Sequence, residues 1–175
     1  MLRPFFLVVP FVLAVGACAP TVSFDVPVDG EATVAGAGGG IIDDVLGSIG
    51  FDGFNNLDFD NTSEFQNNDV SREHVSSARI KSLHIAAVDP ADANFDWIDE
   101  ITFTVSAENE DTVQVASKTV PDGVGEFDCD LDDVELAPYV RQESVQIRTQ
   151  ADARNPPQDT TIRVEIVFGV TADVL

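Results

Sequence analysis

Cysteine, histidine and positive charge are all scarce in this sequence of 175 residues, and each shortage excludes a class of function. Lys and Arg number 9 against 31 Asp and Glu, which gives a formal net charge of −22 at pH 7. Nucleic-acid binding depends on Lys and Arg that neutralise phosphates, so we exclude nucleic acid as a partner. The 2 cysteines cannot build a disulfide scaffold. The 2 histidines, His74 and His84, lack the spacing of zinc ligands.

A membrane-spanning apolar run is also missing. The apolar residues 5–15 fall short of the ~20 residues that cross a bilayer, and Pro10 interrupts them. A positive charge precedes this run and small residues follow it, which is the layout of an export signal. The run ends in Val15-Gly16-Ala17-Cys18, which resembles the lipobox of bacterial lipoproteins. An ordinary signal peptide or a membrane-anchoring helix is the alternative interpretation.

The resemblance implies a leader at residues 1–17 that is removed, and a lipid on Cys18, which becomes the first mature residue. The membrane would then be a partner through that lipid, because the chain has no basic amphipathic segment to bind headgroups. We expect a bacterial cell-envelope location. Ala19, rather than an aspartate, follows the cysteine and favours the outer membrane if the host is an enteric-type Gram-negative bacterium.

Residues 18–175 have the size of one domain, and their pattern predicts an all-β fold. Apolar residues alternate with polar ones in several short runs separated by turn signals, as in an antiparallel β-sandwich. The Cys…Trp…Cys pattern of antibody domains is missing, so the sandwich is Ig-like in shape only. The predicted strands are 22–26, 31–35, 80–88, 101–105, 113–115, 127–131, 145–149 and 162–170, with 136–140 as an edge or turn around Pro138.

The segment 36–70 breaks this pattern and is acidic and irregular. Glycines at 36–40 precede apolar residues at helical spacing, which predicts a short N-terminal helix from Ile41 to Gly47 or Gly50. The remainder offers a few apolar anchors, Phe51, Phe54, Leu57, Phe59 and Phe65.

The acidic run at 58–69 is a candidate calcium-binding loop. Oxygen-bearing side chains occupy the ligand positions of an EF-hand loop, among them Asp58, Asp60, Glu64 and Asp69. Ser63 stands where the loop needs glycine, and Asp69 replaces the bidentate glutamate. We therefore expect no calcium site tighter than roughly millimolar. The second acidic run, 128–133, is interpreted as the outer face of a strand.

No catalytic constellation and no cofactor are predicted. Cys129 lies between Asp128 and Asp130, whose charges oppose a thiolate, so we interpret it as a small buried apolar side chain. The leading hypothesis is a non-catalytic structural or interaction module of the envelope, with an unidentified envelope protein or glycan as its partner. A calcium-dependent carbohydrate- or protein-binding module is the alternative, and an extracytoplasmic hydrolase is the third.

Aromatic residues supply the only sequence support for glycan binding besides the acidic runs. Phe95, Trp97 and Tyr139 are possible stacking residues, although core packing beside Ile98 is the simpler interpretation of Trp97. The stretch from Phe95 to Val105 also looks like segments of uncharacterised bacterial envelope lipoproteins, a likeness that implies no activity.

Overall fold

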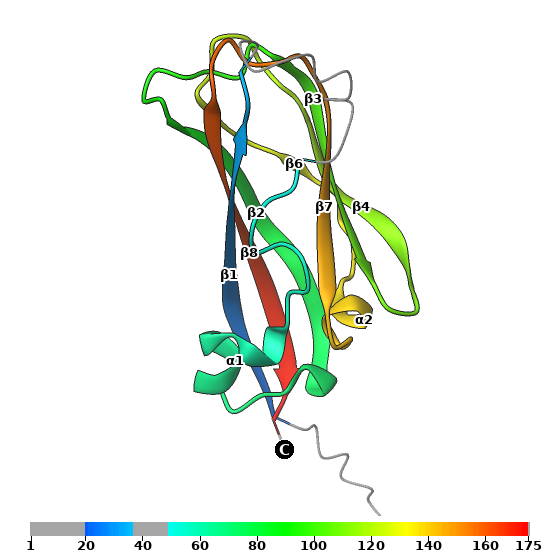
Figure 1. Cartoon of the computed structure of the whole chain (residues 1–175). Helices are drawn as coiled ribbons and strands as arrows, with labels where there is room; N and C mark the ends of the chain where they lie inside the picture. The colour runs from blue at the N-terminus through cyan, green and yellow to red at the C-terminus, as the bar shows by residue number, and fades with distance from the viewer. Residues whose placement is uncertain (1–19, 37–48, 175) are drawn as a thin grey trace, which may run out of the picture.

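Two antiparallel sheets of four strands face each other across an apolar core (Figure 1). The computed structural model describes residues 20–36 and 49–174. One sheet has the order β1 (Thr21–Val34), β8 (Thr160–Asp173), β2 (Val75–Asp89) and β5 (Glu126–Asp128). The other has the order β6 (Asp130–Leu131), β4 (Glu110–Thr119), β3 (Ile98–Ala107) and β7 (Val145–Ala153). This confirms the predicted all-β sandwich.

Several sequence predictions fall outside the described residues. They are the leader at 1–17, the lipidated Cys18 and the helix from Ile41, of which only Ile49 and Gly50 are described, without regular structure. Among the described residues, no helix is long and apolar enough to cross a membrane.

The last strand, β8, is the centre of the first sheet because it pairs with β1 on one side and β2 on the other. Its alternate residues from Ile162 to Val170 are each at most 2% exposed. The two-residue period of a strand puts such residues on one face, and the predicted inward face is confirmed.

At the start of the domain the prediction of two short strands is wrong. Residues 21–34 form one strand, which runs through Pro27 and Gly30 without a break. β1 lies at the edge of its sheet, where a proline can be tolerated because only one side of the strand must supply ladder donors. Gly30 is required for another reason, since a Cβ there would lie 2.7 Å from the Asp52 carbonyl oxygen.

The irregular segment after residue 49 closes the open side of the sandwich between the edge strands β1 and β7. The Asp52 N–H donates to the Glu31 carbonyl on β1 (3.0 Å), and the Ile147 N–H on β7 donates to the Phe54 carbonyl (3.0 Å). Of the five predicted anchors, the four phenylalanines are each at most 2% exposed, and Leu57 is partly buried against the core. The segment continues into three short helical turns, η2 (Phe59–Asn61), α1 (Ser63–Asn67) and η3 (Arg72–His74).

The opposite side is closed by residues 126–131, where the prediction of one strand is wrong. The chain pairs with β2 as β5, then crosses to the other sheet and pairs with β4 as β6. Because the facing changes at the crossing, Leu131 is 38% exposed instead of pointing inward. Cys129 lies at the crossing itself and is buried. The chain then forms a helical turn, α2 (Ala137–Val140), with Pro138 in its first turn, where proline is tolerated.

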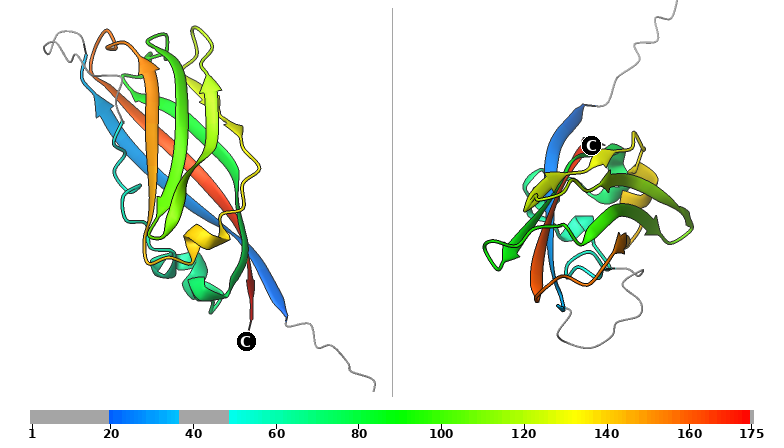
Figure 2. Two further views of the ribbon diagram at one scale, coloured as in Figure 1. Left: turned by 90° about the vertical axis from the view of Figure 1, so that its right-hand side faces the viewer. Right: turned by 90° about the horizontal axis from the view of Figure 1, so that it is seen from above.

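The described chain enters and leaves the sandwich at one end, and three of the connections between strands lie at the other end (Figures 1 and 2). Thr21 pairs with Asp173, so the chain enters β1 and leaves β8 at one end, which we call the proximal end. Val34 pairs with Thr160 at the other, distal end. The distal end carries the connections β2–β3, β4–β5 and β7–β8.

Candidate functional site

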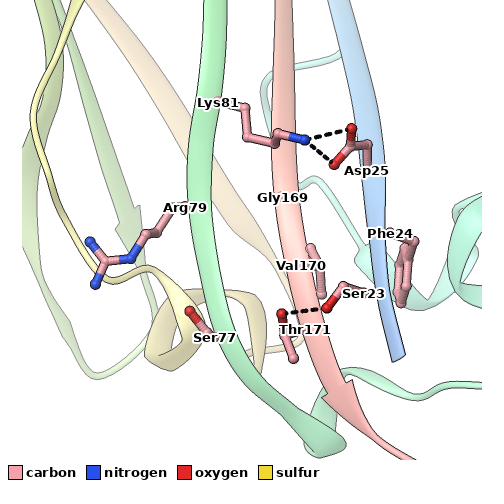
Figure 3. A pocket seen from close by; sticks show the side chains of 9 residues that line it. All are labelled: Ser23, Phe24, Asp25, Ser77, Arg79, Lys81, Gly169, Val170 and Thr171. Atoms are coloured by element: carbon pink, nitrogen blue, oxygen red, sulfur yellow. Dashed lines mark hydrogen bonds and ion pairs between the residues drawn. The ribbon is translucent and has the colours of Figure 1, made fainter. Parts of the chain in front are cut away.

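A depression of about 540 Å³ lies on the outer face of the first sheet, across β1, β8 and β2 (Figure 3). Gly169 forms its floor, and the carbon stem of Lys81 crosses above this glycine to reach the Asp25 carboxylate on β1 (Nζ–Oδ1, 2.9 Å). Below this pair, the hydroxyls of Ser23 and Thr171 are hydrogen-bonded at 2.9 Å.

The β2 side of the outer-face depression is also internally paired. Arg79 forms ion pairs with Asp133 and Glu135, and the Ser77 hydroxyl donates to Glu135 (2.8 Å). Burial alone would raise the pKa of Glu135, but hydrogen bonds from the Ala78 and Ala137 N–H groups and from Ser77, together with Arg79, lower it. Every charged or hydroxyl side chain lining the depression therefore already has a partner within the protein.

A second pocket, of about 330 Å³, lies at the distal end. Asn94, Asp96 and Trp97 line it from the β2–β3 connection, and Arg154, Asn155 and Pro157 line it from the β7–β8 connection. We call this the distal pocket. The two connections are joined by the Arg154 backbone, whose N–H donates to the Trp97 carbonyl (2.7 Å), and by its guanidinium, which donates to the Asp96 carbonyl (2.9 Å).

One buried polar atom of the distal pocket stands out, because the Asn155 Oδ1 atom has no hydrogen-bond partner within the described residues. Trp97 was a candidate from the sequence, whereas Asn94, Arg154 and Asn155 were not. No local signal marks them, since they come from connections far apart in the chain.

The three aromatic residues named as possible stacking platforms are mainly core residues. Phe95 is 0% exposed and packs edge-on against Phe127 at 5.2 Å between ring centroids. Trp97 is 4% exposed, and its indole N–H donates to the Asn94 carbonyl (3.0 Å). Tyr139 is 9% exposed, and its hydroxyl donates to the Asp111 carbonyl (2.7 Å). Core packing of Trp97 is confirmed, and none of the three offers an open ring face.

Cys129 is a buried thiol, as the sequence predicted. Burial is the largest cause that raises its pKa to about 12; Lys118 opposes the rise, while Asp130 and Asp128 add to it. At neutral pH the group is therefore a thiol and not a nucleophilic thiolate.

The two histidines lie in separate parts of the fold and each has a local partner. His84 on β2 contacts Asp128 on β5 (Nδ1–Oδ1, 2.9 Å), and His74 in η3 contacts the Ser71 hydroxyl (3.3 Å).

Two acids of the calcium-like run contact Arg72, a residue outside that run. Asp60 accepts from the Arg72 backbone N–H (2.7 Å) and from its guanidinium (2.9 Å). Asp58 lies 3.4 Å from the same guanidinium and also accepts from the Asp60 N–H, which caps η2. These two carboxylates thus face a cation supplied by the chain itself.

The other two calcium candidates belong to different features. Glu64 lies in α1 and accepts from the Ser63 hydroxyl (2.9 Å), while Asp69 follows that helix with a positive φ of 52°. Within residues 20–36 and 49–174, no three His, Cys, Asp or Glu side chains gather in a group able to hold a metal ion. The weakness of any calcium site stays a prediction.

The second acidic run, at 128–133, is divided among separate partners. Asp128 contacts His84, Asp130 pairs with Lys118 (3.2 Å), and Asp132 accepts from the Gln114 amide (2.9 Å). These acids are exposed.

No protein-family model matches the sequence, and no curated protein matches it either.

Proposed function

We propose that the protein is a lipid-anchored lipoprotein of the bacterial cell envelope and that its β-sandwich is a non-catalytic interaction module. The observation that carries the proposal is the position of the lipobox-like cysteine relative to the fold. Cys18 precedes the first residue of β1, Thr21, by three residues, a length of chain that spans at most about 11 Å. A lipid on Cys18 would hold the proximal end of the sandwich close to the bilayer.

The shape of the domain supports an interaction role for the opposite end. β1 has 14 residues, and a strand rises about 3.3 Å per residue, so the distal connections lie roughly 45 Å from Thr21. An anchored domain would present these connections away from the membrane. The net charge of −22 also favours a lipid over headgroup contacts as the means of attachment, because anionic headgroups repel an acidic surface.

The surroundings of the thiol, the histidines and the acids, which are the residue types most often used in catalysis, support a non-catalytic role. The Cys129 thiol is buried with a raised pKa, and the two histidines have separate partners. Among the acids of the two runs, Asp60 pairs with Arg72, Asp130 with Lys118 and Asp128 with His84, and Asp132 accepts from the Gln114 amide.

Metabolic labelling with a fatty acid, followed by membrane fractionation, tests the anchor, and the chain offers its own matched control. We expect Cys18→Ser to lose the label and leave the membrane pellet, because buried acyl chains contribute about 0.8 kcal/mol per CH₂. Cys129→Ser should keep both the label and the membrane location. The proposal fails if Cys18→Ser pellets to the same extent as the parent protein.

A further inference from the structure

The first sheet ends at β1, and the outer side of this strand from Thr21 to Pro27 has no neighbouring strand (Figure 1). We call this stretch the β1 edge. We propose that it binds an extended segment of another protein by antiparallel β-strand addition, and that this segment alternates basic and apolar residues. The inference rests on the proposed interaction role and names a surface and a kind of partner for it.

The register of β1 against β8 decides which backbone groups point to the edge. In an antiparallel pair, every second residue bonds to the partner strand, and the residues between point their N–H and C=O groups away. The Val174 N–H donates to the Pro20 carbonyl (2.8 Å), and the β1–β8 ladder continues this register without a shift. The even-numbered residues of β1 therefore bond to β8, and the odd-numbered residues face the edge. The Asp52 N–H, which reaches the Glu31 carbonyl from outside the sheet (3.0 Å), agrees with this assignment.

Three residues of the β1 edge, Thr21, Ser23 and Asp25, have backbone N–H and C=O groups without a partner in the described chain. The hydrogen bonds that Ser23 and Asp25 do form come from their side chains. All three residues are exposed. Backbone groups without a partner are rarely buried, so these groups face water, which a pairing strand can replace.

Pro27 and the segment after residue 49 limit the β1 edge. Proline has no N–H, so a ladder along the edge weakens at Pro27. Farther along, Asp52 already bonds to Glu31, and a Cβ on Gly53 would lie 2.9 Å from the Asp29 carbonyl oxygen. The edge therefore has room for a segment of about seven residues, the length of the stretch itself.

The two faces of the β1 edge differ in character. Val22 and Phe24 belong to the inward row but are only partly buried, and Phe65 of α1 packs on Phe24 from the core side (ring centroids 5.2 Å). Ser23 and Asp25 lie on the outer face (Figure 3). A paired strand places its side chains beside these two rows. Apolar residues of the partner would extend the inward row, and residues of opposite charge would lie beside Asp25.

Charge favours a basic segment and opposes a second copy of this chain. Asp25 and Asp29 project from the outer face, and the whole chain carries −22. Asp25 pairs with Lys81, whereas Asp29 forms no ion pair within residues 20–36 and 49–174. Like charges on neighbouring strands are destabilising, so two β1 edges would repel each other. Lysine or arginine on the added strand would instead be attracted by these acids.

The other sheet edges are shorter or covered. β5 and β6 have only three and two residues. The β7 edge bonds to Leu57 and to Phe54 of the segment after residue 49, and its next two inward residues, Thr149 and Ala151, are at most 2% exposed. Among the described edges, β1 therefore offers the longest exposed run of backbone groups.

The test is the binding of fluorescent synthetic peptides to the full chain in detergent, measured by fluorescence anisotropy. The probe alternates lysine and valine over about the length of the β1 edge, and we expect saturable binding. A peptide with glutamate in place of lysine should bind about tenfold more weakly or worse, because its charges are repelled.

Methylated peptides test the ladder itself. Directly opposed residues of an antiparallel pair share a face and exchange hydrogen bonds, so the lysines opposite the odd-numbered residues would donate to β1. Methyl groups on the lysine backbone nitrogens should abolish binding. The matched control carries the methyl groups on the valine backbone nitrogens, which point away from β1, and should bind as the unmethylated probe does.

A matched pair of variants changes the edge of the protein. Ser23→Pro removes an N–H that faces the edge and leaves the β1–β8 ladder its bonds, and Pro27 shows that β1 accommodates proline at an odd-numbered position. Ser23→Ala removes the same hydroxyl but keeps the N–H. We expect Ser23→Pro to weaken binding about tenfold or more and Ser23→Ala to bind as the parent does.

Thermal melting checks that both variants fold. If Ser23→Pro melts early, hydrogen exchange of the parent decides: the N–H groups of Thr21, Ser23 and Asp25 should exchange more slowly with the probe bound. The inference is wrong if the lysine–valine peptide does not bind, if the glutamate or lysine-methylated peptide binds equally well, if a folded Ser23→Pro binds as Ser23→Ala does, or if these N–H groups are not protected.

Failure here is separable from failure of the proposed function, since the Cys18→Ser labelling and fractionation do not involve the β1 edge. An anchored protein that ignores the lysine–valine peptide contradicts only the strand addition.

Discussion

Replacing Ile166 by alanine tests whether β8 is the centre of the core. Ile166 is 0% exposed and lies between Val28 on β1 and Leu83 on β2, both of which are also buried. The neighbouring residue, Glu165, lies on the opposite face of the same strand and is exposed. The pair therefore compares an inward and an outward position at one point of the fold.

The expected loss in the free energy of unfolding follows from the atoms that the substitution removes. Isoleucine to alanine deletes three carbon groups, and each buried group contributes about 0.8 kcal/mol, which gives about 2.4 kcal/mol for the lost transfer alone. The neighbours on β1 and β2 are held in the ladder and cannot fully fill the space, so a cavity adds to this loss. Large-to-small core changes of this kind cost about 2–5 kcal/mol in total. Glu165→Ala should stay within about 0.5 kcal/mol.

Urea denaturation followed by tryptophan fluorescence measures both variants, because the chain has one tryptophan, Trp97, and it is buried. With a slope of about 2 kcal/mol per molar urea, Ile166→Ala should lower the midpoint by about 1–2.5 M without changing the slope. Equal midpoints for the two variants, or a larger loss in Glu165→Ala, would show that the facing of β8 is the reverse of the one described.

Three further predictions concern closure of the sandwich, pH and metal. Gly30→Ala should destabilise the protein by about 1–3 kcal/mol, because its Cβ would lie 2.7 Å from the Asp52 carbonyl oxygen. Gly50→Ala is the control, since a Cβ there meets no atom within 4 Å. Equal melting temperatures for the two variants would refute the close packing of the segment after residue 49 against β1. Glu135 has a lowered pKa in the folded state, so the stability it contributes is present above the ordinary carboxyl pKa of 4.5 and is lost as the pH falls through the folded value. Glu135→Gln should therefore be less stable than the parent at pH 7, and the gap should narrow towards acid; a gap that is constant with pH contradicts this. Thermal melts in chelator and in millimolar calcium, with magnesium as the control, should coincide; a calcium-selective rise of several degrees that Asp58→Ala with Asp60→Ala abolishes would favour the calcium-dependent module.

The sequence by itself determined the fold class and much of the facing. From Ile162 to Val170 each inward residue of β8 is apolar, so the two-residue period alone gives the buried face of this stretch. The runs 101–105 and 113–115, which were predicted as separate strands, pair in the β3–β4 hairpin, and Asn109 in its turn has the positive φ that asparagine tolerates. Cys129 and Trp97 were correctly interpreted as buried.

Tertiary structure alone decided where the chain changes sheets and what the acids bind. The alternation of apolar and polar residues predicts which side chains point inward only while the strand stays in one sheet. It therefore predicted the wrong side for Leu131, because the chain leaves its pairing with β2 and pairs with β4 before that residue. Two strands were predicted at 22–26 and 31–35, because the local pattern does not reveal that one edge strand, β1, continues through Pro27. Spacing along the run 58–69 could not show Arg72, which folds back onto Asp58 and Asp60.

The distal pocket shows the same limit most clearly. Asn94 and Asn155 are separated in the chain by every element from β3 to β7, and they line one pocket only because the β3–β7 ladder brings Ile98 opposite Ala153. Strand pairing over such a separation is set by packing of the whole core and not by the residues next to each asparagine. Local sequence thus fixes which residues turn inward, whereas the pairing of distant strands decides which polar residues meet.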